Sequence, residues 1–179
     1  KEAPSYFAAN SEANIAGSLI AALGYHIAYP DYIGFGASNP VPHPDEHRAS
    51  LASASLDMLR ASKEFIRKEK ISWDERLYIA GYSAGGYATM ALQKKIEEET
   101  GSEFNLKASS CGAGAYDKTA FMKYIISTKT SGVVSSNQLY LWVTLTYDRL
   151  YNLNRPTAQY FKEPWAGLIQ TGKENTNVN

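Results

Sequence analysis

Apolar residues follow helical and strand spacings in turn along the first two thirds of the chain. Small and apolar side chains that recur every three or four residues predict helices. Short apolar runs between them predict strands, of which the run at residues 25–29 is rich in β-branched and aromatic residues and is expected to be buried, while the run at residues 106–111 is the weakest. Gly24 and Gly101 stand where two of the helices are expected to end. The predicted helices cover residues 10–23, 45–70 and 84–100, and the predicted strands cover residues 25–29, 77–80 and 106–111.

This strict alternation of helix and strand predicts an α/β fold with a parallel sheet and crossover helices. The alternation of helix and strand ends after Gly114, because residues 117–130 and 136–151 both have the apolar spacing of helices. We therefore expect two regions, an α/β core portion over residues 1–114 and a helical cap or lid insertion over residues 115–179. The apolar helix near residues 139–151 is either core or a lid that lines an apolar acyl pocket.

The composition is that of an ordinary globular chain of one domain. Among 179 residues, 44 % are hydrophobic and 20 % are charged, which excludes a disordered chain. Eighteen basic residues balance eighteen acidic ones, and this argues against a nucleic-acid partner. The sequence has no apolar run of about 18 residues, so no transmembrane segment is predicted. The single cysteine excludes an internal disulfide or a multi-cysteine zinc site, and no cofactor is predicted.

The candidate chemistry lies at Gly81-Tyr82-Ser83-Ala84-Gly85, between a predicted strand and a predicted helix. A G-x-S-x-G sequence in this context is typical of a sharp turn that lifts a serine hydroxyl above the sheet at a strained backbone angle. Such a turn presses together the residues two before and two after the serine, which explains a glycine at each. We predict Ser83 as a catalytic nucleophile and the backbone N–H of Ala84 as an oxyanion-hole donor. The alternative is a glycine-rich turn with an idle serine.

The sequence around this motif resembles the α/β-hydrolase family over roughly residues 14–130. Residues 81–87 read G-x-S-x-G-G-Y, as in secretory-lipase-like and prolyl-oligopeptidase-like members, and residues 29–38 and 111–117 are similar to secretory-lipase segments. The resemblance implies a serine hydrolase in which Ser83 attacks a carbonyl, a histidine takes its proton and a carboxylate orients the histidine. The implied substrate is a small-molecule ester or lipid. The resemblance also favours a secreted or cell-envelope protein.

The catalytic histidine of this family follows the nucleophile along the chain, yet His26, His43 and His47 all precede Ser83. We expect His26 to be a core histidine within its strand. We expect His43 and His47 to lie in a solvated loop or at a helix start. Because neither end of the sequence looks like a natural terminus, we expect an internal piece of a longer polypeptide, or a processed one, with the triad acid and histidine outside it.

Two aspartates follow Ser83, and both have structural interpretations. Asp117 is expected to cap a helix or to lie at the surface, and Asp148 is expected to pair with neighbours on its own helix. The loop residues Asp31, His43, Asp45, Glu46 and His47 have no spacing that aligns them as metal ligands.

The sequence therefore favours a serine esterase or lipase. Two alternatives remain open, a prolyl-oligopeptidase-like peptidase and a noncatalytic binding protein on a hydrolase scaffold. The oligomeric state is not predicted.

Overall fold

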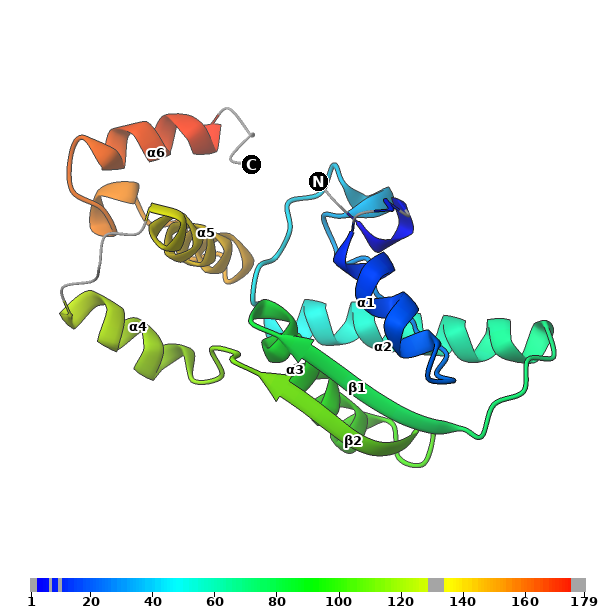
Figure 1. The fold of residues 1–179 in the computed structure, drawn as a ribbon. Helices are drawn as coiled ribbons and strands as arrows, with labels where there is room; N and C mark the ends of the chain where they lie inside the picture. Colours follow the sequence, from blue (N-terminus) through cyan, green and yellow to red (C-terminus); the bar gives the residue numbers. More distant parts are fainter. Residues whose placement is uncertain (1–2, 7, 10, 129–133, 175–179) are drawn as a thin grey trace. The chain divides into compact units, whose positions relative to one another are not determined.

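Two parallel strands, β1 (Arg76–Tyr82) and β2 (Asn105–Gly112), form a sheet in the structure, a computed structural model that describes residues 3–6, 8–9, 11–128 and 134–174. Parallel neighbours need a crossover connection. Here it is α3 (Ala84–Glu99), which runs behind both strands in Figure 1. The parallel α/β arrangement predicted from the sequence is therefore confirmed.

The hydrophobic core lies where α2 (Arg48–Lys68) and α3 pack together behind the sheet. The apolar spacing of Leu51, Ala54, Met58, Ala61 and Phe65 predicts one buried face for α2, and this prediction is only partly right because Phe65 is 58 % exposed. The buried residues of α2 are Leu51, Ala52, Ser55, Leu56 and Leu59. Alanine and serine residues occur on several sides of α2, so two neighbouring faces of the helix are similarly apolar. Packing against α3 determines which of the two is buried. The core cluster comprises Leu56, Leu59, Ile79, Leu92, Ile96 and Phe104.

The strand predicted at residues 25–29 is wrong, because this segment has no hydrogen-bonded strand partner in the described part of the chain. Side-chain contacts attach it to other parts of the first unit. The Tyr25 ring lies edge-on to the Tyr78 ring of β1, with centroids 6.0 Å apart. His26 is exposed and its Nε2 lies 2.9 Å from the Ser72 carbonyl oxygen, so the expected core histidine is also wrong.

The first of two compact units spans residues 1–133 and also contains η1 (Pro4–Tyr6), α1 (Glu12–Ala21), η2 (Gly36–Ser38) and α4 (Lys118–Ser127). As predicted, α1 ends before Gly24, which has a φ of +92°. Such a left-handed angle suits glycine because it has no Cβ. The start of α4 is set by Asp117, whose Oδ1 accepts a 2.8 Å hydrogen bond from the Ala120 amide. The capping role predicted for Asp117 is confirmed.

The second unit spans residues 134–179 and contains α5 (Val134–Leu150), η3 (Thr157–Gln159) and α6 (Trp165–Glu174). Asp148 of α5 is buried, and its Oδ1 accepts hydrogen bonds from the Tyr160 hydroxyl at 3.0 Å and the Arg155 amide at 3.1 Å. Both donors lie outside α5. The pairing of Asp148 within its own helix stays a prediction. The unit begins after α4, whereas the predicted cap begins at residue 115, and the role of that region as a cap stays a prediction.

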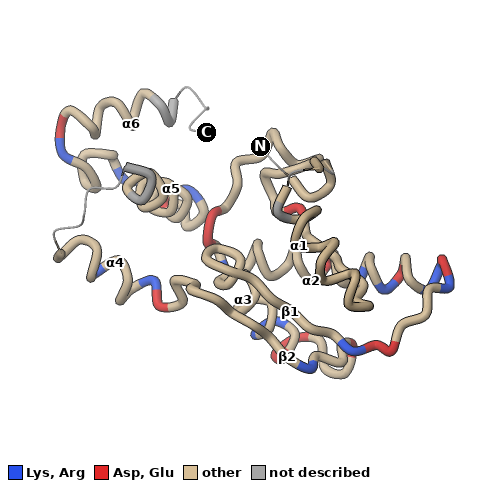
Figure 2. The backbone as a smooth tube through the Cα atoms, viewed as in Figure 1, with Lys and Arg blue, Asp and Glu red and all other residues tan. Residues whose placement is uncertain are grey.

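Charged residues of both signs are interspersed along the first unit. Figure 2 shows basic and acidic positions alternating on α2 and on the connection from α2 to β1. None of the helices in the described part of the chain combines the length and the apolar character that crossing a bilayer requires.

Candidate active site

Ser83 lies in the bend between β1 and α3, with a φ of +56° and a ψ of −122°. For a residue with a Cβ this backbone conformation costs about 1–3 kcal/mol, so it persists only where the surrounding structure imposes it. The residue is exposed. Among the described residues, no side chain forms a hydrogen bond to the Ser83 hydroxyl. The bend therefore presents this hydroxyl to the outside of the first unit.

Two glycines around Ser83 allow close approaches of the backbone. A Cβ on Gly81 would lie 2.2 Å from the Gly85 carbonyl oxygen, and a Cβ on Gly86 would lie 2.2 Å from the Gly112 carbonyl oxygen. The prediction for Gly81 is thus confirmed. The prediction for Gly85 is wrong, because a Cβ there would have no atom within 4 Å among the described residues. The turn excludes a side chain at positions 81 and 86 instead.

Hydrogen bonds on both sides of its backbone hold Ser83 in the bend. Its N–H donates to the Gly112 carbonyl oxygen at 2.8 Å, which joins the bend to the end of β2. Its carbonyl oxygen accepts a 3.1 Å hydrogen bond from the Tyr87 amide, the first hydrogen bond of α3. The conformation of Ser83 is thus determined by both β2 and the first turn of α3.

The amide of Ala84 begins α3 directly after Ser83. Amides that precede the first i→i−4 bond of a helix have no partner within the helix, and they form its positive dipole end. The N–H groups of residues 84–86 belong to this set, because the Tyr87 amide makes the first such bond. The start of α3 can therefore stabilise negative charge that develops beside Ser83.

His43 and His47 both contact nearby residues of the chain. His43 is buried, with Nδ1 2.6 Å from the Ile33 carbonyl oxygen and its ring 4.7 Å from that of Phe35. The solvated position predicted for His43 is therefore wrong. His47 precedes α2, as predicted, and its Nδ1 lies 2.7 Å from Ser50 Oγ. Partial burial and the nearby positive charge of Arg48 lower the pKa of His47.

A polar cluster of the first unit consists of Lys118, Glu46 and Asp45. The sequence predicts no function for it. Lys118 Nζ forms an ion pair with Glu46, and Asp45 lies nearby with its Oδ2 buried and without a hydrogen-bond partner. Burial raises the pKa of Asp45, although the charges of His43 and Lys118 oppose that rise. No group of three potential metal-ligating side chains occurs within the described ranges.

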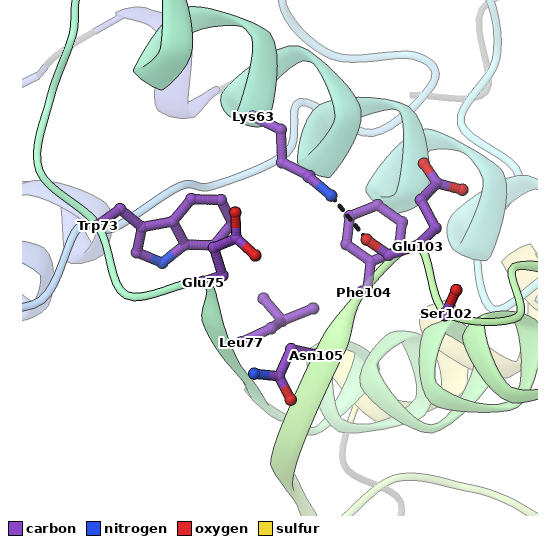
Figure 3. A pocket seen from close by; sticks show the side chains of 8 residues that line it. All are labelled: Lys63, Trp73, Glu75, Leu77, Ser102, Glu103, Phe104 and Asn105. Carbon is purple, nitrogen blue, oxygen red and sulfur yellow. Dashed lines mark hydrogen bonds between the residues drawn. The ribbon is translucent and has the colours of Figure 1, made fainter.

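A small pocket lies at the opposite end of the strands from Ser83 (Figure 3). Its volume of about 50 Å³ is far below the roughly 300 Å³ at which small-molecule sites begin. Lys63 of α2 lines it, donates a 2.6 Å hydrogen bond to the Glu103 carbonyl oxygen and lies with its Nζ 4.9 Å from the centre of the Phe104 ring. Ligands of open parallel sheets bind at the carboxyl ends of strands, so this pocket does not compete with the site at Ser83.

Known proteins share both the sequence pattern and the fold. The sequence pattern of the secretory lipase family matches residues 10–141. The rice cell wall degrading esterase LipA from Xanthomonas oryzae is 32 % identical over 76 % of this chain and 36 % of its own, with a TM-score of 0.61. A protein of Legionella pneumophila assigned as a hydrolase superposes with a TM-score of 0.77 at 24 % identity, over 90 % of this chain and 43 % of its own.

Both structures are therefore more than twice as long as the part that this chain matches. Comparison of the sequence with curated proteins gave no match.

Proposed function

Because the chain belongs to the secretory lipase family, within the α/β-hydrolase superfamily, we propose that it acts as a serine hydrolase that cleaves carboxylic esters through an acyl-enzyme on Ser83. The main support is the backbone of Ser83, which has a φ of +56° in an exposed bend directly before the start of α3. Strained residues of this kind cluster at active sites, where the strain orients a reacting group.

The proposed reaction has two halves. Ser83 Oγ attacks the ester carbonyl carbon while a base takes the hydroxyl proton, and the Ala84 amide donates a hydrogen bond to the oxyanion that forms. The tetrahedral intermediate then expels the alcohol, which receives the proton from the base. Water, deprotonated by the same base, then attacks the acyl group, the bond between the acyl carbon and Ser83 Oγ breaks, Oγ takes the proton back from the base and the carboxylic acid is released.

The base and its carboxylate partner are proposed to come from outside residues 1–179. In the family the histidine follows the nucleophile, whereas the three histidines of this chain precede Ser83. His43 contacts the Ile33 carbonyl oxygen in the loop before α2, and His47 contacts Ser50 in the first turn of α2. Asp117 accepts its hydrogen bond from the first turn of α4. These contacts support structural roles for the three side chains.

Covalent labelling of the full-length protein with a fluorophosphonate tests this proposal. We expect wild-type protein to be labelled and to hydrolyse p-nitrophenyl esters. Ser83→Ala should lose the label and at least about 10⁴-fold in kcat. Ser110→Ala on β2 is the matched control and should behave as the wild type, since Ser110 is an exposed serine two residues before Gly112.

Three outcomes would overturn parts of the proposal. Equal labelling of wild type and Ser83→Ala would show that another residue is the nucleophile. Cleavage of prolyl peptides in preference to esters would favour a peptidase. A full-length wild-type protein that takes no label and cleaves neither substrate would favour a noncatalytic binding protein.

A further inference from the structure

The last residue of β2 and the segment that follows it lie directly against the bend that holds Ser83. Gly112 accepts the hydrogen bond from the Ser83 amide at 2.8 Å. Ala113 has a φ of +51°, and a Cβ on Gly114 would lie only 2.6 Å from the Tyr87 amide nitrogen. Residues 112–114 therefore lie against the backbone of Ser83 and of the first turn of α3, and a shift of this segment would move the bend.

The same segment ends at Lys118, the first residue of α4, which joins three parts of the first unit. Its Nζ forms an ion pair with Glu46 Oε2 in the loop before α2. It also lies 4.9 Å from the centre of the Tyr87 ring of α3 and 5.9 Å from that of Phe121 in α4. The side chains of Lys118 and Glu46 are only 16 % and 10 % exposed, so the pair is largely shielded from water.

We propose that the Glu46–Lys118 ion pair is a positioning device for Ser83: it keeps residues 112–118 against the first turn of α3 and so maintains the strained backbone of Ser83. This role rests on the proposed function of Ser83 as nucleophile. Lys118 and Glu46 are positioning residues, because their contacts reach Ser83 only through Tyr87 and through the segment that begins at Gly112.

Backbone strain explains why such a device is needed. Ser83, Ala113 and Glu46 all have positive φ angles although each carries a Cβ. Angles of this kind cost free energy and persist only where other contacts over-determine them. A largely buried ion pair is a suitable restraint, because separating its charges would leave one of them unpaired and poorly solvated. The cation–π contact with Tyr87 transmits this restraint to the turn that follows Ser83.

The charges around Lys118 make the device sensitive to pH. Glu46 and Asp45 face its ammonium from the loop before α2, Tyr87 faces it from α3, and His43 lies beside Asp45. Burial lowers the pKa of Lys118 to about 8, although the Asp45 carboxylate opposes this effect. Deprotonation above this pH removes both the ion pair and the cation–π contact. Arginine keeps its charge to much higher pH.

The test compares Lys118→Met, Glu46→Gln and Lys118→Arg in the full-length protein. Lys123→Met, at an exposed position of α4, is the matched control. A displacement of about 1 Å can cost about 10²-fold in rate. We therefore expect Lys118→Met and Glu46→Gln to lower kcat about 10- to 100-fold with KM within about twofold of the wild type. Lys118→Arg should keep the kcat of the wild type. We expect the wild type to lose activity above about pH 8 and Lys118→Arg to lose it only at higher pH.

Amide hydrogen exchange supplies a readout that does not need activity. We expect the Tyr87 amide to exchange faster in Lys118→Met and Glu46→Gln, while the Ile96 amide in the same helix keeps its wild-type rate. Wild-type kcat together with wild-type Tyr87 exchange in both variants would overturn the proposal, as would equal effects of Lys123→Met. If Lys118→Met does not fold, the kcat and the Tyr87 exchange rate of Glu46→Gln and Lys118→Arg test the proposal instead. If the wild type cleaves no ester, the proposed function fails, and Tyr87 exchange alone still decides whether the ion pair positions Ser83.

Discussion

The amide of Ser83 donates a 2.8 Å hydrogen bond to the carbonyl oxygen of Gly112, so the bend after β1 is tied to the end of β2. The same oxygen is the atom that a Cβ on Gly86 would meet at 2.2 Å. The ends of both strands and the first turn of α3 therefore converge on one carbonyl group. This convergence predicts how the bend responds to substitution.

Gly86→Ala should destabilise the protein by about 2 kcal/mol or more, because its Cβ would overlap the Gly112 carbonyl oxygen and force the backbone apart. Gly85→Ala is the matched control one residue earlier. Its Cβ has open space among the described residues, and alanine favours a helix over glycine by up to about 1 kcal/mol. Urea unfolding of the two variants and the wild type measures the difference. Equal loss of stability in both variants would contradict the assigned contact.

Ser83→Gly should be more stable than Ser83→Ala by about 1 kcal/mol, because glycine adopts a φ of +56° without the steric cost that a Cβ imposes. Both variants lack the hydroxyl and should be inactive, so the comparison isolates the strain from the chemistry. Thermal or urea unfolding checks it. An alanine variant as stable as the glycine variant would show that the bend stores little strain.

Asp45→Asn should raise stability at pH 7 by about 1 kcal/mol, because burial raises the pKa of Asp45 and one of its carboxylate oxygens has no hydrogen-bond partner. A carboxyl group whose pKa rises on folding binds its proton more tightly in the folded state. It therefore adds no cost below its ordinary pKa of about 3.9 and costs stability as the pH rises through the folded value.

The gain from Asp45→Asn should accordingly disappear when unfolding is measured near pH 3.5. Asp57→Asn, at an exposed position of α2, serves as the control and should change stability by less than about 0.5 kcal/mol at either pH. A loss of stability in Asp45→Asn at pH 7 would indicate that the charged form of Asp45 is favoured by its surroundings.

Most of the helices and both strands of the sheet could be predicted from the sequence, because the spacing of apolar residues and the residues that end a helix are local features of the chain. Gly24 and Gly101 mark helix ends, and both have positive φ angles in the structure. Residues 25–29 have strand composition as well, but a strand also requires a neighbouring backbone to pair with. The composition of a segment does not determine whether such a neighbour is present. Here Tyr25 contacts Tyr78 of β1 through its side chain instead.

The candidate nucleophile could be predicted for the same reason, since the pattern around Ser83 is contained in five consecutive residues. The polar cluster could not be predicted, because Glu46 and Lys118 are 72 positions apart in the sequence and only the packing of α4 near the loop before α2 brings them together. The same holds for Asp148, whose donors Arg155 and Tyr160 reach it by a turn of the chain after α5.

The sequence by itself determined where the chain bends between β1 and α3 and which hydroxyl stands at that bend, because short-range backbone sterics around Gly81 and Ser83 are encoded locally. The tertiary structure alone decided that Gly86 rather than Gly85 must lack a side chain, that Gly112 lies against the bend and that Lys118 lies against the Tyr87 ring. These contacts join residues distant in sequence, and their energies depend on burial and on close approach in space, which no local pattern records.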